Sequence, residues 1–464
     1  MPKGNEKSKV NLPGHVVAEL FGAGLLVAEK GTDQLRMADP SLSVFLPLLT
    51  SFDVKIVPVS IDACPVRFCS GILKTPSGFP QSEGGLMTTI PAGGQGKTSE
   101  DATISCLGEL AERISLYSQG KRDTRVFASK AHQPEVGLAR MLGLSSAQER
   151  QLARGGVTEG KSAHESAPDW LEMSDRRVEI SRLGGPVCDP ASAQFPSIGV
   201  LFDELEWAAG GRMSLASSSG CAVWSDLKGA RERALLELVE RDAVAQAWYN
   251  RLGITVFDDG CLSEILPGSL SAFLSGRHRH WSLCAVDTDL DAFVVMAVSH
   301  DVDGRRAAFG SSAGWDLASA CESAIQEMLQ SEYSLELMEK AYAAAAEPNR
   351  VSATLPRQLV FAREKSIFEE IPLKDACATA PEGLGKSFTY EGLLQGCLEK
   401  GFEIWEFDAT RSDLNIPCIK LLSPDLCSWE PRFGKRRLFE GVVKRGLRAI
   451  PATEAEFAAR PFPF

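Results

Sequence analysis

The sequence has no excess of basic residues: its 464 residues include 49 lysines and arginines against 61 aspartates and glutamates, a net charge of −12. No basic run with interleaved aromatic residues occurs, which argues against a nucleic-acid-binding surface. The twelve cysteines contain no Cys-x-x-Cys pair, so no zinc site is expected. No secretory signal is recognisable, and the apolar run 20–28 is far too short to span a bilayer. We therefore expect a cytoplasmic protein whose thiols stay reduced.

One sequence pattern, in contrast, occurs three times. The copies are 105–113 (Ser-Cys-Leu-Gly-Glu-Leu-Ala-Glu-Arg), 233–241 (Arg-Ala-Leu-Leu-Glu-Leu-Val-Glu-Arg) and 323–331 (Ser-Ala-Ile-Gln-Glu-Met-Leu-Gln-Ser). Apolar residues recur in each copy at helical spacing, and two acidic or amide side chains stand at i and i+3. Because residues three apart share one face of a helix, the paired polar groups point the same way.

Paired carboxylates on one helix face repel each other and favour a cationic partner. The pairs here are Glu109 with Glu112 and Glu237 with Glu240. Mg²⁺ suits them, since it takes oxygen ligands and usually combines one or two carboxylates with substrate phosphates. A single such pair is more often a solvated helix face, with an arginine supplying salt bridges. Three copies in one chain favour a metal and triphosphate site instead.

At these motifs the chain resembles the YcaO family of ATP-dependent enzymes that modify peptide backbones. The similarity begins at Gly94-Gln-Gly-Lys-Thr98, passes through the first copy, and resumes at Ser218-Ser-Gly-Cys-Ala222. It continues through the second copy with Asp242 and ends in the third copy at Gln330, so it covers nearly three quarters of the chain. The resemblance implies a mixed α/β fold with two sheet-and-helix lobes around an ATP site. It also implies phosphorylation of a backbone amide oxygen.

The resemblance implies a role for several residues of this chain. Mg²⁺ is expected on the four paired carboxylates, Glu109, Glu112, Glu237 and Glu240. Arg113 and Arg241 are expected either to complete the electrostatic clamp on the triphosphate or to hold the glutamate pairs. The further nucleotide contacts expected are Ser105, Lys97, Ser219, Glu327 and Gln330.

Three positions depart from the family pattern. The glycine-rich loop carries Gln95 where a lysine is usual, and we expect Lys97 to take over the phosphate contact. Ser219 replaces the asparagine of a Ser-Asn-Gly motif, and Glu332 replaces the arginine of a Gln-x-Arg motif. Glu332 is expected either to point away from the nucleotide or to remove a cation contact. A Walker A loop is excluded at 96–98, because Pro91 stands where that motif requires glycine.

The C-terminus ends in Arg-Pro-Phe-Pro-Phe, a stiff extended end that suits insertion into a groove. Family members that form azolines carry a Pro-rich end that reaches the active site. The resemblance therefore favours a cyclodehydratase of thiazole/oxazole-modified microcin (RiPP) biosynthesis, in which Cys, Ser or Thr attacks the preceding carbonyl and ATP turns the oxygen into a phosphate leaving group. As a hypothesis, the Phe464 carboxylate serves as a base.

We expect residues 1–50 to be an N-terminal element and residues 51–464 to be one catalytic domain. The resemblance implies a precursor peptide with a leader, a separate E1-like leader-binding protein and an FMN-dependent azoline dehydrogenase as partners. Two other readings stay open. One is a thioamide-forming enzyme of the same family, and the other is a non-catalytic scaffold that keeps the fold.

Other segments have predictable secondary structure. Helices are expected at 316–331, 334–347 and 390–400, and Thr98 or Ser99 is expected to cap the first motif helix. The basic cluster 432–437 is expected either to contact phosphate or peptide or to be solvated. Strands are expected at 54–61, 283–286, 293–298, 307–309, 402–408 and 417–422, with Pro58 placing the first at a sheet edge or a bulge.

Overall fold

The structure is a computed structural model and describes residues 14–22, 24–29, 31, 35–38, 40–75, 89–153, 175–184, 192–202, 204, 215–344, 356–373 and 385–463. The N-terminal elements are α1 (Gly14–Gly22), β1 (Leu26–Ala28), β2 (Leu35–Met37), η1 (Pro40–Phe45), α2 (Leu46–Ser51), β3 (Asp53–Ser60), β4 (Arg67–Lys74), β5 (Thr89–Gly96) and α3 (Ser99–Leu116). There follow η3 (Gly120–Arg122), β6 (Phe127–Ala128), α4 (Leu138–Leu142), α5 (Ser146–Ala153), β7 (Arg176–Arg182), β8 (Ser192–Pro196), η4 (Ser197–Gly199) and β9 (Cys221–Val223).

The second half of the chain begins with the long helix α7 (Leu227–Asn250). The next elements are β10 (Ile254–Val256), α8 (Asp259–Ile265), α9 (Gly268–Ser275), β11 (His280–Val286), β12 (Phe293–His300), β13 (Ala308–Gly314) and α10 (Leu317–Ala344). The last are α12 (Arg357–Glu364), α13 (Ile367–Glu370), α14 (Tyr390–Glu399), β14 (Trp405–Asp408), β15 (Cys418–Leu422), α15 (Arg436–Lys444) and α16 (Glu454–Ala458).

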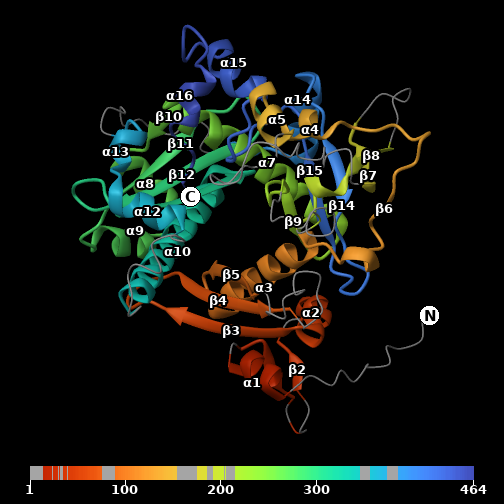
Figure 1. Ribbon diagram of the computed structural model, residues 1–464. Coiled ribbons are helices and arrows are strands. Elements are labelled where there is room, and N and C mark those ends of the chain that lie inside the picture. Colours follow the sequence, from red (N-terminus) through yellow and green to blue (C-terminus); the bar gives the residue numbers. More distant parts are fainter. Residues whose placement is uncertain are drawn as a thin grey trace.

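The described strands form antiparallel sheets, so the chain has the mixed α/β fold that the sequence predicted. One sheet has the order β3-β4-β5, a second β10-β11-β12-β13, and a third β6-β7-β14-β15-β9 with β8 on β7, while β1 and β2 form a hairpin. Figure 1 shows the three-stranded sheet with α3 at the bottom, the four-stranded sheet with α10 at the left and the largest sheet at the right. Helix α7 lies among them, near the centre.

Burial explains why these segments fold as they do. Strand β3 alternates, with Val54 and Ile56 buried and Asp53 and Lys55 exposed, which is the period of a half-buried strand. It pairs only with β4 in its sheet, which confirms the edge position expected from Pro58. Helix α7 is buried over most of its surface, because it packs on both the largest and the four-stranded sheet. A charge on the buried part of α7 therefore needs a partner or a ligand.

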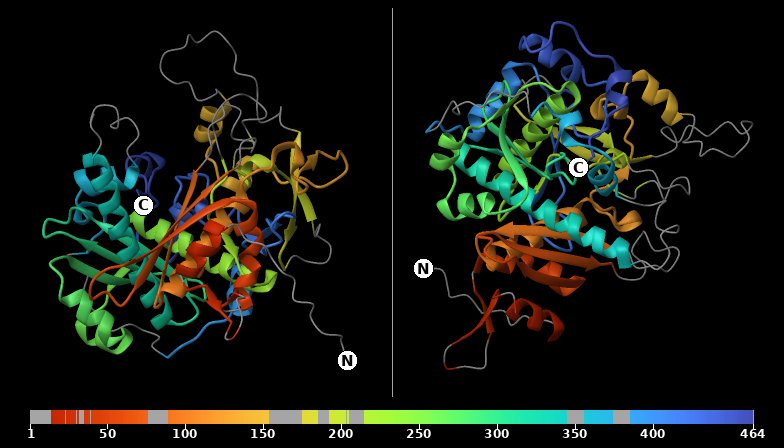
Figure 2. Two further views of the ribbon diagram at one scale, coloured as in Figure 1. Left: turned by 90° about the horizontal axis from the view of Figure 1, so that it is seen from below. Right: turned by 90° about the vertical axis from the view of Figure 1, so that its left-hand side faces the viewer.

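The three motif copies lie in α3, α7 and α10, as the sequence predicted. Long helix α10 crosses the three-stranded sheet (Figure 2). The ring of Tyr333 on α10 stacks on that of Phe68 on β4, with 6.3 Å between the ring centroids. The predicted strands and the helix at 390–400 are present as well. Strand β5 was not predicted, because its glycines and Pro91 read as an irregular passage.

Candidate active site

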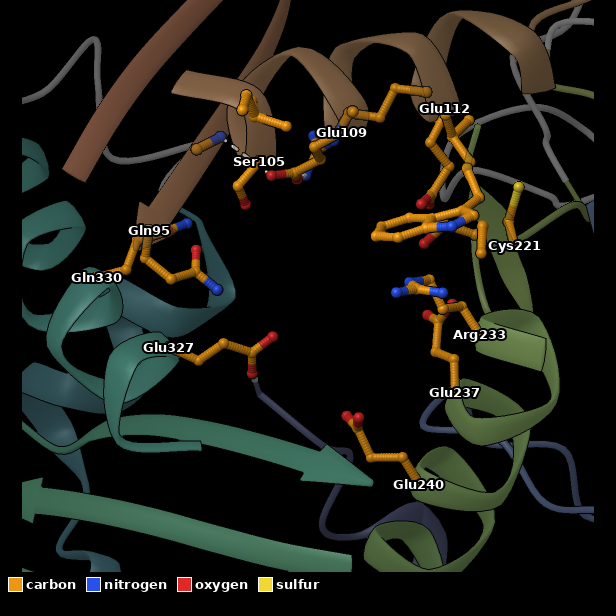
Figure 3. A pocket seen from close by; sticks show the side chains of 18 of the residues that line it. Gln95, Ser105, Glu109, Glu112, Cys221, Arg233, Glu237, Glu240, Glu327 and Gln330 are labelled. Carbon is orange, nitrogen blue, oxygen red and sulfur yellow. Dashed lines mark hydrogen bonds and ion pairs between the residues drawn. The ribbon is translucent and has the colours of Figure 1, made fainter. Parts of the chain in front are cut away.

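A cavity of about 770 Å³ lies where α3, α7 and α10 meet. Figure 3 shows that Glu109 and Glu112 of α3, Glu237 and Glu240 of α7, and Glu327 of α10 all point into it. Elements β5, β9 and η1 contribute further to its walls. Five carboxylates from three distant segments thus face one space.

Helix α3 presents the first pair of carboxylates. A capping box between Thr98 and Asp101 starts the helix, as expected from the sequence. Gly94 brings β5 close against the helix, since a Cβ there would stand 2.1 Å from the Ala102 carbonyl oxygen. One oxygen of Glu109 then accepts the backbone N–H of Gly93 at 3.1 Å, and the other accepts a bond from Arg113.

Helix α7 presents the second pair of carboxylates. The Asp226 carboxylate accepts the Gly229 N–H at 2.8 Å and caps the start of the helix. Arg241 Nη2 donates to Glu237 at 3.0 Å, and its guanidinium carbon lies 3.4 Å from the ring centroid of Trp429. Glu240 accepts the Ser311 hydroxyl at 2.6 Å.

Helix α10 repeats the arrangement. The backbone N–H of Ser311 donates to Glu327 at 3.0 Å, as Gly93 does to Glu109, and in both cases the donor precedes the glutamate by 16 residues. Cys221 of β9 precedes Glu237 by the same number of residues, and its backbone lowers the pKa of the Glu237 carboxyl. A strand followed by a helix, with a strand amide fixing the helix glutamate, is therefore the repeated unit behind the sequence pattern.

The cavity is lined by more acidic than basic residues, five glutamates against three arginines. Burial raises the pKa values of Glu112, Glu237 and Glu240, and neighbouring carboxylates add to the effect at Glu112 and Glu240. Burial, with the charge of Glu240, raises the pKa of Glu327 to about 8. Burial lowers the pKa of Arg241, but the surrounding carboxylates outweigh it and raise that pKa overall.

The structure brings most of the predicted site residues to this cavity. Ser105 and Gln330 line it together with the five glutamates, and Arg113 and Arg241 line it while holding Glu109 and Glu237. Of the two roles expected for these arginines, the structure shows the holding of the carboxylates. Phe464 lies outside the described residues.

Two predicted nucleotide contacts do not line the cavity. Lys97 is exposed at the end of β5 and pairs with Glu322 at 3.1 Å. The Ser219 carbonyl accepts a bond from Lys420, and its neighbour Ser218 lines the cavity in its place. Both residues were chosen because they stand next to motif positions in the sequence. In extended backbone, a shift of one residue turns the side chain to the opposite face.

Glu332 and the basic cluster have other partners. Glu332 points away from the cavity and pairs with Arg277 at 2.6 Å, so the first of the two alternatives for this residue holds. The expectation that 432–437 contacts phosphate or peptide, or is solvated, was wrong for its buried members Lys435 and Arg437. Lys435 donates to the Met141 carbonyl, and Arg437 pairs with Asp242 at 2.8 Å. These long-range partners are invisible in a local charge run.

Sequence reasoning missed three residues of the cavity wall and a lysine that supports the wall from behind. Buried Lys420 on β15 donates to the Ser217 and Ser219 carbonyls at 2.6 and 2.9 Å and so fixes the loop before β9. Trp224, Arg233 and Trp429 line the cavity without belonging to the paired acidic positions. Of these residues, only Lys420 could have been found from the sequence, because a lysine inside an apolar strand needs buried hydrogen-bond acceptors.

The cavity fits a magnesium nucleotide. Within the described ranges, no three His, Cys, Asp or Glu side chains converge as the ligands of one ion. Mg²⁺ does not require such a cage, because it combines one or two carboxylates with phosphates and water. The buried Gln330 Oε1 has no hydrogen-bond partner, and such an atom on a cavity wall suits a ligand donor. Paired carboxylates with raised pKa values suit divalent cations.

Fold and cavity together define a mixed α/β protein built to hold a phosphate-bearing ligand through divalent cations on paired carboxylates. The chain belongs to the YcaO family: the family model described as "YcaO cyclodehydratase, ATP- and Mg²⁺-binding" matches residues 93–427. ATP and Mg²⁺ are thus the ligands of this family. The matched range contains all three motif helices, α3, α7 and α10.

Solved structures share the fold. One described as a heterocyclase in complex with substrate and cofactor has a TM-score of 0.70 and 22% identity, over 97% of this chain and 60% of its own length. YcaO from Methanopyrus kandleri, bound with AMPPCP and Mg²⁺, has a TM-score of 0.52 and 17% identity, over 80% of this chain and 86% of its own length. A chain of the E. coli microcin synthetase McbBCD complex has a TM-score of 0.53 and 15% identity, over 89% of this chain and 96% of its own length.

This chain therefore spans 60% of the length of that heterocyclase. Among curated proteins, none matches the sequence. In the part of the chain that the structure describes, no helix is long and apolar enough to cross a membrane.

Proposed function

We propose that this protein is an ATP-dependent cyclodehydratase that converts Cys, Ser or Thr residues of a ribosomally made precursor peptide into azolines. The observation that carries the proposal is the convergence of five glutamates from three strand–helix units on one cavity. Membership of the YcaO cyclodehydratase family supports the reaction class. A heterocyclase and a microcin synthetase among the solved structures with this fold agree with it.

The glutamates and arginines of the cavity would divide the work between them. Glu109, Glu112, Glu237 and Glu240 would hold Mg²⁺, and Arg113 and Arg241 keep two of these carboxylates in place. The Gly93 amide and the Ser311 hydroxyl fix the direction of Glu109 and Glu240. Ser105, Glu327 and Gln330 would supply further contacts to the nucleotide.

The chemistry needs a leaving group. The substrate thiol or hydroxyl adds to the preceding carbonyl, and the resulting oxyanion leaves poorly as hydroxide. Bound ATP supplies the phosphoryl group, so that phosphate is expelled and each ring costs one ATP and releases ADP. The preorganised carboxylates would hold the reacting groups in place.

The C-terminus approaches the same cavity. Phe462 is buried and packs on Trp429 at 4.5 Å between ring centroids, and Trp429 lines the cavity. As a part of the proposal, the Phe464 carboxylate two residues later accepts the proton of the attacking group. The contact of Phe462 with Trp429 on the cavity wall supports this role.

The proposal includes partner proteins. A precursor peptide with a leader, a separate E1-like leader-binding protein and an FMN-dependent azoline dehydrogenase are the partners that the family resemblance implies. The microcin synthetase structure, a complex of three named subunits, agrees with an assembly of this kind.

The test is reconstitution with a precursor peptide, its leader-binding partner, ATP and Mg²⁺, followed by mass spectrometry. We expect each modified residue to lose one water, together with stoichiometric phosphate release. A gain in mass from exchange of oxygen for sulfur would identify the thioamide-forming alternative. If the peptide mass does not change and no ATP is consumed, the result contradicts catalysis and favours the non-catalytic scaffold. The Glu240→Gln variant is the matched inactive control.

A further inference from the structure

Arg233 differs from the other arginines of the cavity. Among the described residues that line it, the arginines are Arg113, Arg233 and Arg241, and the first and last each hold a glutamate. Arg233 makes no ion pair within the described ranges, and its one hydrogen bond goes to the Gly229 carbonyl at 3.3 Å. Burial lowers its pKa, which the nearby acids Glu232 and Asp226 do not restore. The Arg233 side chain is exposed at the cavity, so its remaining N–H groups are open to a ligand.

Trp224 holds this guanidinium in place. The Arg233 Cζ atom lies 3.1 Å from the centroid of the Trp224 ring, a close stacking contact. The indole also lies against Gly229, one helical turn earlier, where a Cβ would stand 2.0 Å from the ring. Figure 3 shows Arg233 directed into the cavity on the same side as Glu237. A stacked arginine loses little freedom when it binds, since its orientation is already fixed.

We propose that Arg233, positioned by Trp224, binds a phosphoryl group inside the cavity. A planar guanidinium with several unused N–H groups matches phosphate oxygens in charge and geometry. Its place on the wall that carries Glu237 puts it beside the expected triphosphate. The inference rests on the proposed ATP-dependent function. The phosphoryl group comes either from the nucleotide or from the phosphate released by the reaction.

Calorimetric binding tests the inference without turnover. The titrants are ATP with Mg²⁺, ADP with Mg²⁺, and inorganic phosphate added to the ADP-bound protein. We expect Arg233→Met to weaken binding of at least one titrant by about tenfold or more, about 1.4 kcal/mol. Arg305→Met is the control, because Arg305 is exposed, pairs with Asp303 and does not line the cavity. Thermal unfolding of each variant verifies that it is folded.

The pattern of loss identifies the phosphate. Weaker ATP binding with unchanged ADP binding assigns Arg233 to the terminal phosphate, and equal losses assign it to an inner phosphate. A loss confined to inorganic phosphate assigns it to the released product. Trp224→Ala and Gly229→Ala should show the same pattern more weakly, whereas Trp224→Phe keeps an aromatic face and most of the affinity.

Unchanged binding of all three titrants by Arg233→Met would overturn the inference and leave the proposed function intact. Wild-type protein that binds no nucleotide with Mg²⁺ would instead overturn the proposed function, and the inference with it. Binding lost in Arg233→Met but retained in Trp224→Ala would remove the positioning role of Trp224.

Discussion

At the level of single residues, the cavity is unusual in its buried glutamates, which outnumber the arginines beside them. Glu240 is 9% exposed and accepts bonds from a hydroxyl and an amide, yet it has no ion pair among the described residues. A buried charge of this kind is costly without a partner. In the ligand-free protein the raised pKa of Glu240 relieves this cost, and we infer that a bound cation would remove it.

The pH dependence of stability follows from Glu327. Its carboxyl has a pKa of about 8 in the folded chain against an ordinary value of 4.5. Between these values the folded chain keeps a proton that the unfolded chain has released, so raising the pH favours unfolding. We expect Glu327→Gln, without divalent cations, to become steadily more stable relative to wild type as the pH rises through this window.

Denaturant unfolding at several pH values with a chelator measures this difference. Glutamine keeps an oxygen that accepts the Ser311 amide, so the change reports mainly on the charge. Glu391→Gln on the exposed face of α14 is the control, and it should show no comparable trend. A stability difference that stays constant with pH would contradict the prediction.

At the scale of elements, the strand–helix unit is what positions each glutamate. Two glycines allow the close approach: a Cβ on Gly94 would stand 2.1 Å from the Ala102 oxygen, and one on Gly310 would stand 2.3 Å from the Ala324 oxygen. Both obstacles are helix backbone, which moves only as a whole. The glycines thus set the distance over which strand amides reach the helix carboxylates.

Gly94→Ala should therefore destabilise the protein by about 1–3 kcal/mol and weaken nucleotide binding, because β5 must move away from α3. Gly396→Ala is the matched control, since that helical glycine has nothing within 4 Å of its Cβ position. We expect the control to gain about 0.5–1 kcal/mol from helix propensity. Chemical denaturation measures both, and equal stabilities of the two variants would contradict the packing argument.

Elements with a strong period were predictable from the sequence. The helical motif copies and strands such as β12 were found because their apolar spacing is local. Strand β5 was missed, since its glycines serve packing against α3 and Gln330 rather than a turn. The cluster 432–437 was misread because the partners of Arg437 and Lys435 lie far away in the sequence.

At the scale of the whole molecule, the C-terminal tail ties the cavity wall together. The Phe462 ring packs on Trp248 at 5.2 Å, on Phe309 at 5.4 Å and on Trp429 at 4.5 Å. Trp429 in turn stacks on Arg241, which holds Glu237. Contacts thus run from the end of the chain to a predicted magnesium ligand.

Phe462→Ala should cost about 3–5 kcal/mol of folding stability, because it leaves a cavity in an aromatic cluster. It should also weaken nucleotide binding, through the loss of support for Trp429 and Arg241. Val302→Ala, at a position that is 81% exposed, is the control and should stay within about 0.5 kcal/mol of wild type. Unchanged stability and unchanged nucleotide binding in Phe462→Ala would contradict a supporting role of the tail.

The candidate site was predictable as a set of paired acids but not as a complete cavity. Glu109, Glu237 and Glu327 carry a repeated local signal. The stack of Trp224 on Arg233, and the Lys420 contacts with a loop 200 residues earlier, exist only after the sheets assemble. Contacts between such distant residues follow no fixed spacing in the sequence, so a single sequence does not reveal them.

Mg²⁺-dependent ATP binding, measured by calorimetry on the wild type and on Glu109→Gln with Glu237→Gln, tests the central claim most directly. Glutamine keeps the shape and an acceptor oxygen but removes the charges that would hold the metal. We expect wild-type binding that requires Mg²⁺ and is lost in the double variant, while Glu391→Gln with Glu399→Gln on exposed α14 positions binds normally. Undiminished binding by the Glu109→Gln, Glu237→Gln variant would contradict the account.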